Sequence, residues 1–191
     1  CREAADYVME RRGEFGAQRV VVGGESAGAH LAMLAALHLK RRADFADVAG
    51  LVLFYGVYDL GGTQMARTAA ADALVLHGPS MRRGGERLLP GLSEAERRDP
   101  AISPAFADLS GMPPALLICG ELDPLLDDTR LMAERLAAAG GRVDCEIVPD
   151  APHAFNRFRT AMAAKTNAHV RAWIAARLAG DADRRRHAAT E

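Results

Sequence analysis

The 191-residue sequence predicts an α/β protein in which helices flank a parallel β-sheet. Four short apolar runs have the length and composition of buried strands. They occupy residues 19–22, 49–55, 115–119 and 143–148. Segments with helical periodicity lie between these runs and after the last one. This alternation favours parallel pairing, because a crossover helix returns the chain to the edge where the next strand begins.

The expected helices account for much of the remaining chain. The first covers residues 1–12 and is amphipathic. The second follows the first strand and is apolar nearly all round until basic residues 40–42 close it, so we expect a buried, central helix. Four more are expected at residues 69–76, 79–89, 128–139 and 160–178.

The length of the chain is enough for one domain with a sizeable core. We expect residues 1–179 to form it. Within it, residues 59–111 make a long connection between two strands, and such an insertion usually contributes to the wall of a binding pocket. The polar stretch 180–191 is expected to be a disordered tail.

Composition restricts the class of partner. The chain has 24 basic and 25 acidic residues and a net charge of −1 at pH 7, which argues against nucleic-acid binding. Its three cysteines are too few for a disulfide framework and lack metal-binding spacing, so we expect a reduced, cytoplasmic protein with no metal or organic cofactor. No apolar run reaches the length of a membrane span, and no membrane partner is expected.

The segment Gly24-Glu25-Ser26-Ala27-Gly28 stands between the first predicted strand and the apolar helix. A serine on such a sharp strand-to-helix turn presents an exposed hydroxyl, an arrangement called a nucleophile elbow. The glycines on either side leave room for neighbouring chain segments. Ser26 is therefore a candidate covalent nucleophile. The backbone N–H of Ala27, at the helix N-terminus, is a candidate donor to an oxyanion.

A serine nucleophile needs a base, and the base works best beside a carboxylate that orients it. After the third strand the chain offers several carboxylates. We choose Asp123, which follows the strand closely and precedes a proline, and keep Glu121 as the reserve candidate. Asp127 and Asp128 stand where a helix needs an N-cap and are more simply explained in that way.

The loop after the fourth strand contains His153, at the edge of the sheet where Ser26 and Asp123 are expected. The order serine, then acid, then histidine is that of a nucleophile-elbow hydrolase. His153 is therefore the candidate general base. His30 lies one helical turn after Ser26. Its helix leads away from the serine, so His30 is a weaker candidate for the base than His153. The remaining histidines are better explained as structural or exposed residues; they are His38, His77, His169 and His187.

In these motifs the sequence resembles the α/β-hydrolase superfamily, and within it the hormone-sensitive-lipase-like bacterial esterases. The resemblance covers residues 1–178 and includes a GDSAG-like elbow with Glu25 in place of aspartate. It also includes a G-x-x-DP-L-x-DE-like acid loop at residues 120–128 and an HGF-like loop that begins at His153 and has Ala154 as its second residue. The resemblance implies a Ser26–His153–Asp123 triad and a pocket wall formed in part by residues 59–111.

One feature of the family has no counterpart in this sequence. Members normally carry an HGGG-like loop upstream that supplies further oxyanion N–H groups. Here the His77-Gly78 pair is followed by Pro79, which has no N–H. The family's N-terminal strands and cap helices also lack counterparts. We therefore expect the C-terminal portion of a hydrolase of about 300 residues, weakly active or inactive as an isolated fragment.

The resemblance implies a carboxylesterase or lipase-like serine hydrolase that cleaves small, uncharged esters with short to medium acyl groups. Two alternatives stay open: hydrolysis of amides, lactones or carbamates by the same triad, and a hydrolase-like protein that binds a small molecule without turnover. Five residues could either line the wall of the substrate pocket or belong to the hydrophobic core: Phe54, Tyr55, Tyr58, Leu74 and Leu76. The last strand is expected at a sheet edge, where pairing with a second copy would give a homodimer.

Overall fold

The computed structural model describes residues 1–179 and contains one parallel sheet, so the predicted fold class is confirmed. The strands are Val20–Glu25 (β1), Val48–Phe54 (β2), Ala115–Gly120 (β3) and Val143–Val148 (β4). Their order across the sheet is the same as their order along the chain. β1 runs three residues further than the sequence predicted, because Gly23, Gly24 and Glu25 continue to pair with β2.

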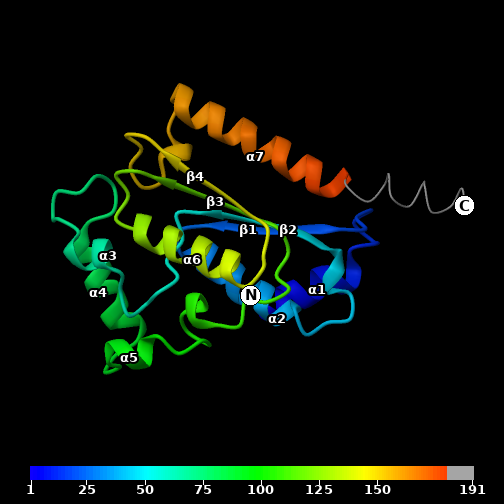
Figure 1. The fold of residues 1–191 in the computed structure, drawn as a ribbon, viewed down its shortest axis with the longest axis horizontal. Helices are drawn as coiled ribbons and strands as arrows, with labels where there is room; N and C mark the ends of the chain where they lie inside the picture. Colours follow the sequence, from blue (N-terminus) through cyan, green and yellow to red (C-terminus); the bar gives the residue numbers. More distant parts are fainter. Residues whose placement is uncertain (180–191) are drawn as a thin grey trace, which may run out of the picture.

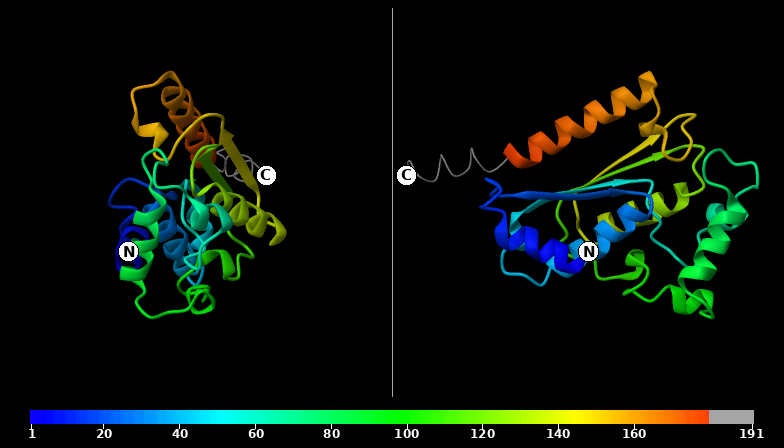
Figure 2. Two further views of the ribbon diagram at one scale, coloured as in Figure 1. Left: turned by 90° about the vertical axis from the view of Figure 1, so that its left-hand side faces the viewer. Right: turned by 180° about the vertical axis from the view of Figure 1, so that it is seen from behind.

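Helices cover both faces of the sheet (Figures 1 and 2). The helices on one face are α1 (Arg2–Arg11), α2 (Ala27–Leu39) and α6 (Leu126–Ala138). The opposite face carries α7 (Ala161–Ala179). Three short 3-10 helices occupy connections: η1 (Phe45–Asp47), η2 (Pro104–Phe106) and η3 (Phe155–Arg157). Among residues 1–179, no helix is both long and apolar enough to span a bilayer.

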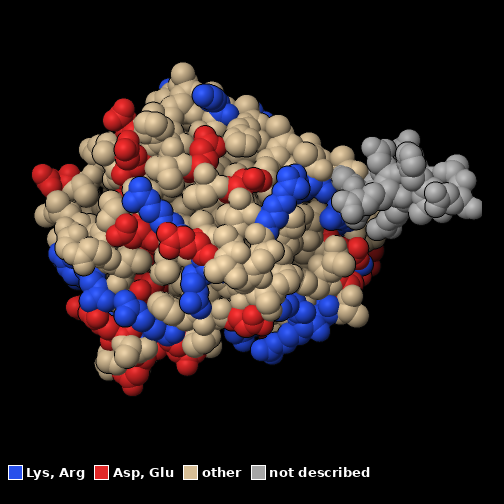
Figure 3. Space-filling view, in the orientation of Figure 1, with Lys and Arg blue, Asp and Glu red and all other residues tan. Residues whose placement is uncertain are grey.

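Surface charges of both signs are interspersed on the face shown in Figure 3. Some of them hold the first helix in place. Arg12, next to the end of α1, forms ion pairs with Asp44 at 3.0 Å and Asp47 at 2.6 Å. His38 of α2 contacts Asp6 of α1 at 2.7 Å. These contacts fix α1 against α2 and the loop that follows it.

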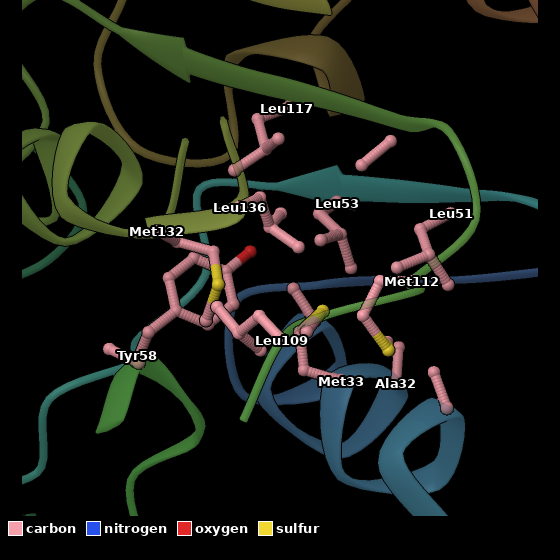
Figure 4. Packing of buried hydrophobic residues seen from close by; sticks show 14 residues of the cluster. Ala32, Met33, Leu51, Leu53, Tyr58, Leu109, Met112, Leu117, Met132 and Leu136 are labelled. Atoms are coloured by element: carbon pink, nitrogen blue, oxygen red, sulfur yellow. The ribbon is translucent and has the colours of Figure 1, made fainter. Parts of the chain in front are cut away.

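The two central strands divide the core into two layers, because successive side chains of a strand point to opposite faces. Every residue of β2 and β3 is buried. One layer combines alternate strand residues with α2 and α6; its strand members are Leu51, Leu53, Ala115 and Leu117 (Figure 4). The other layer packs against α7; its strand members are Val52, Phe54, Leu116 and Ile118.

α2 is buried on one side only. Met33, Ala29 and Ala36 are fully buried, whereas Leu31 is 44% exposed. The expectation of a helix buried all round is therefore wrong for the face that carries Leu31. This face points away from the sheet, and among the described residues α1 covers only part of the helix surface.

The connection between β2 and β3 contains α3 (Gln64–Thr68), α4 (Gly78–Leu88) and α5 (Glu94–Arg97), beyond one end of the sheet (Figure 1). The helix predicted at residues 69–76 is absent. That segment forms turns, and Val75 has a positive φ of 67°. Its apolar residues have no core to pack against, Leu74 being 60% exposed, and a short isolated helix is only marginally stable. The predicted tail, residues 180–191, lies outside the described residues.

Candidate active site

Ser26 occupies the turn between β1 and α2, and its backbone is strained. β1 ends at Glu25 and α2 begins at Ala27, which leaves one residue to reverse the chain direction. Ser26 has φ 54° and ψ −121°, a conformation unfavourable for a residue with a Cβ. Its N–H donates to the carbonyl of Phe54 at 2.9 Å, so the turn is anchored to the end of β2.

The two glycines of the elbow differ in what they do. A Cβ on Gly24 would lie 2.2 Å from the carbonyl oxygen of Gly28, so any side chain there would displace the backbone of α2. A Cβ on Gly28 would meet no atom within 4 Å. The prediction of a steric requirement therefore holds for Gly24 and is wrong for Gly28 within the described residues.

Ser26, His153 and Asp123 form one hydrogen-bonded chain. The Oγ of Ser26 lies 3.0 Å from Nε2 of His153. Nδ1 of the same imidazole lies 2.8 Å from Oδ2 of Asp123. With Nδ1 protonated and donating to the carboxylate, Nε2 is left as an acceptor for the serine hydroxyl. The geometry therefore allows the imidazole to remove the serine proton.

Burial and local bonds hold this chain in place. Asp123 is fully buried, and its Oδ1 accepts the N–H of Leu125 at 2.9 Å. His153 is 6% exposed, and the Tyr55 ring packs against the imidazole with centroids 4.6 Å apart. Ala154, the next residue, adopts the left-handed conformation at φ 59° and turns the chain into η3. The imidazole thus has little freedom to leave the serine.

The reserve candidates occupy other positions. Glu121 is exposed and accepts the N–H of Asp150 at 3.3 Å, away from the imidazole. Neither Asp127 nor Asp128 is an N-cap, since α6 begins at Leu126 and its N-cap residue is Leu125. Both lie in the first turn, where a negative charge is favourable. Asp128 accepts the hydroxyl of Thr63 in the β2–α3 connection, and Asp127 accepts the N–H of Met65 in α3.

Asp128 is a buried carboxylate that the sequence did not single out as a structural link. It accepts the N–H groups of Tyr58 at 2.7 Å and Asp59 at 3.0 Å, and the hydroxyl of Thr63 at 2.6 Å. Burial raises its pKa to about 6, although these three donors act to lower it. The carboxylate therefore ties α6 to the segment that leaves β2 beside the site.

A second buried network links the serine turn to the histidine loop. The amide nitrogen of Asn156 donates to Glu25, which precedes Ser26, at 2.8 Å. The amide oxygen of Asn156 accepts the hydroxyl of Tyr55 at 2.5 Å, and the ring of Tyr55 rests on His153. No motif in the sequence points to Asn156, because its partners come from distant positions.

His30 takes no part in this chain of hydrogen bonds. Its Nδ1 lies 2.9 Å from the carbonyl of Val57, and burial lowers its pKa. The other described histidines contact surface partners: Asp6 for His38, the Ala71 carbonyl for His77, and Glu146 for His169. His187 lies outside the described residues.

A hollow of about 430 Å³ opens at Ser26 and Ala27 and runs toward α3, α4 and α5. Its apolar lining consists of Val57, Leu60, Ala66, Leu76, Met81, Leu88 and Leu125. Of the five wall-or-core residues, only Leu76 lines it; Phe54, Tyr55 and Tyr58 are core residues, and Leu74 is exposed. Residues 1–179 contain no group of three or more side chains arranged to hold a metal ion.

Comparison with known proteins decides the family. A family model described as the alpha/beta hydrolase fold matches residues 1–157. The chain belongs to the α/β-hydrolase family. This assignment agrees with the parallel sheet, the strained serine turn and the acid and histidine loops at one edge of the sheet.

Solved structures of two esterases and of a hormone-sensitive lipase resemble this α/β-hydrolase. An esterase from Pyrobaculum calidifontis has 28% sequence identity and a TM-score of 0.80, covering 90% of this chain and 57% of that chain. A hormone-sensitive lipase from a metagenome library has 30% identity and a TM-score of 0.75, covering 90% and 58%. An esterase from Rhizomucor miehei has 25% identity and a TM-score of 0.82, covering 93% and 58%. The chain thus spans somewhat more than half the length of these relatives.

Proposed function

We propose that this α/β-hydrolase cleaves carboxylic esters through an acyl-enzyme on Ser26. The observation that carries the proposal is the continuous chain from the Ser26 hydroxyl through His153 to Asp123, with distances of 3.0 and 2.8 Å. The similarity to proteins named as esterases supports the same reaction class.

In the first half-reaction, Oγ of Ser26 attacks the ester carbonyl while Nε2 of His153 takes the hydroxyl proton. Asp123 stabilises the imidazolium that forms. The N–H of Ala27, the first residue of α2, has no intrahelical acceptor and can donate to the oxyanion. When the tetrahedral intermediate collapses, the imidazolium passes its proton to the departing alkoxide, and the alcohol leaves.

The second half-reaction repeats these steps with water. His153 removes a proton from water, the hydroxide attacks the acyl carbonyl, and the proton returns to Oγ of Ser26 as the carboxylic acid leaves. Charged residues such as Asp59, Arg67 and Arg97 also line the hollow, and its apolar side chains support small, uncharged esters of short to medium acyl chain as substrates.

Active-site labelling tests the proposal. A fluorophosphonate probe should label the wild-type chain, and the Ser26→Ala variant should neither take up the probe nor hydrolyse p-nitrophenyl butyrate. Ser110→Ala, which removes a serine hydroxyl bonded to Lys40, is the matched control and should behave as wild type. Equal labelling of the wild-type chain and Ser26→Ala, or equal and measurable turnover by both, would contradict the proposal.

The rate expected of this chain is low. Ala27 supplies one backbone donor to the oxyanion, whereas members of the family normally have further donors from an HGGG-like loop. The loss of one such donor from a complete site lowers the rate by about 100- to 1000-fold. Turnover at the level of a full-length esterase would contradict the expectation of a weakly active chain, and labelling without measurable turnover would agree with it.

A further inference from the structure

α4 forms one wall of the hollow that opens at Ser26. Its contribution includes Met81 and Leu88 and, between them, the consecutive glycines Gly84 and Gly85. A glycine in a helix interior lowers helix stability relative to alanine, because the unfolded chain loses more conformational freedom. Two adjacent glycines in an 11-residue helix therefore require a reason.

The backbone around these glycines gives no such reason. A Cβ on Gly84 would meet no atom within 4 Å, and one on Gly85 would meet only Nη1 of Arg97, at an ordinary 3.6 Å. Neither residue has a positive φ. Another glycine of the same wall is different: a Cβ on Gly61 would lie 2.8 Å from the carbonyl of Glu94.

The two glycines leave space in the hollow that opens at Ser26. Gly84 and Gly85 line the same hollow as Ser26 and Ala27. Gly84 is exposed and Gly85 is half-buried. Because both line the hollow, we expect larger side chains at these two positions to narrow it. The rest of the lining includes apolar side chains, among them Leu60 and Leu76, which suit an alkyl chain.

We propose that Gly84 and Gly85 set the length of the alkyl chain that an ester substrate can place along α4. This inference rests on the proposed esterase function and names the part of the substrate that the hollow receives. The chain can belong to the acyl or to the alcohol part of the ester. The space at the two glycines admits an alkyl chain of medium length. A side chain at residue 84 limits the hollow to a shorter alkyl chain.

Two ester series test this proposal in the full chain. In one series the acyl group lengthens from acetyl to octanoyl with a constant p-nitrophenyl leaving group. In the other, the alcohol lengthens with a constant acetyl group. Gly84→Leu should lower kcat/KM for the eight-carbon member relative to the shortest by about tenfold or more in one series, which identifies the chain that lies along α4.

Arg83→Leu is the matched control, since it adds a leucine to the same helix at an exposed position that does not line the hollow. Its chain-length profile should equal that of the wild type. Gly84→Ala should raise the melting temperature by about 2–4 °C, because alanine is the better helix former and meets no neighbour. A Gly84→Leu profile unchanged in both series would overturn the inference while the esterase function stands.

A binding measurement decides the inference even if turnover is absent. In the Ser26→Ala background, saturation-transfer NMR should detect methyl octanoate or octyl acetate on the protein, and adding Gly84→Leu should abolish that signal. An unchanged signal would overturn the inference independently of catalysis. A wild-type chain that takes up no fluorophosphonate probe and turns over no faster than Ser26→Ala, with the binding difference intact, would count against the esterase function alone.

Discussion

Among single residues, Asp128 combines complete burial with three hydrogen-bond donors. Its raised pKa, about 6, means that desolvation outweighs those donors. In the folded state protonation is easier than in the unfolded chain, whose aspartate titrates near 3.8. The contribution of this group to stability is therefore largest below pH 3.8 and is lost as the pH rises through 6.

Asp128→Asn should remove this pH dependence. The amide oxygen can accept the N–H groups of Tyr58 and Asp59, and the amide nitrogen can donate to the hydroxyl of Thr63. The unfolding free energy of the variant and of the wild type should be measured in urea at pH 4 and at pH 8. The difference between the two proteins should shift in favour of the variant by up to about 3 kcal/mol between these pH values. A difference that does not change with pH would contradict the raised pKa.

Asp128→Ala separates the charge from the hydrogen bonds. It leaves the N–H groups of Tyr58 and Asp59 buried without an acceptor, at a cost of about 1–3 kcal/mol each. This variant should be destabilised at both pH values in the same urea experiment. Stability equal to that of Asp128→Asn would show that the two backbone donors find another acceptor.

Asn156 should influence turnover without contacting the substrate. Asn156→Ala removes the partner of both Glu25 and Tyr55, and so loosens the support beneath His153. Small misplacements of a catalytic base cost up to about 100-fold in rate. We expect kcat for a short ester to fall by about 10- to 100-fold with KM little changed; a change confined to KM would argue against this role.

At the level of elements, α7 packs on the sheet through Val170, Trp173 and Ile174, and Trp173 also forms a hydrogen bond to a strand. Trp173, the only tryptophan in the chain, is 7% exposed and lies over Gly50 of β2. Its indole N–H donates to Asp144 of β4 at 2.7 Å. The absence of a side chain at Gly50 is what lets the ring approach the strand.

Gly50→Ala should therefore displace the helix. The new Cβ would lie 2.7 Å from a ring carbon of Trp173, and overpacking of this kind costs about 1–3 kcal/mol. We expect a lower melting temperature and a red-shifted tryptophan emission. Gly84→Ala, the same substitution where no neighbour is present, should change stability in the opposite direction. Unaltered emission in Gly50→Ala would mean that the strand, rather than the helix, adjusts.

Elements with strong periodicity could be predicted from the sequence, and those without a core could not. β4 was predicted with its observed limits, and the apolar runs of β2 and β3 were located to within a residue. Residues 69–76 have helical composition but no surface to pack against. The capping box of α5, in which Ser93 and Glu96 bond reciprocally, also marks the start of a helix in the sequence.

The same reasoning explains which site residues could be predicted. Ser26, Asp123 and His153 each follow a strand, and parallel strands bring their carboxyl ends to one edge. Asp128 and Asn156 act through partners about 70 and 130 residues away, and nothing in local spacing signals such pairs. Burial and long-range hydrogen bonds therefore appear only once the fold is known.

For the whole molecule, charge balance and sheet edges act together. The chain has 24 basic and 25 acidic residues, and the isoelectric point of its sequence, about 6.7, lies between pH 6 and pH 7. The net charge therefore passes through zero in this interval. In the sheet of residues 1–179, β1 and β4 are edge strands with unpaired backbone groups, which favour self-association when repulsion is lost.

Light scattering should reveal a solubility minimum between about pH 6 and 7, with clear solutions at pH 8.5. The sign follows from the charge balance, since the chain has a net charge of −1 at pH 7 and reaches zero net charge at about pH 6.7. Added salt should have little effect at the minimum, where electrostatic repulsion is already small. Constant solubility across this range would show that edge pairing, and not charge, controls association.

The agreement between chain order and sheet order has a consequence for synthesis on the ribosome. Each of β2, β3 and β4 emerges after its preceding neighbour in the sheet has been made, and none of them has to insert between two earlier strands. The hydroxyl of Ser26, however, meets its imidazole only after 127 further residues have been translated. The nascent polypeptide therefore carries an unassisted serine until β4 and the loop beyond it have left the exit tunnel.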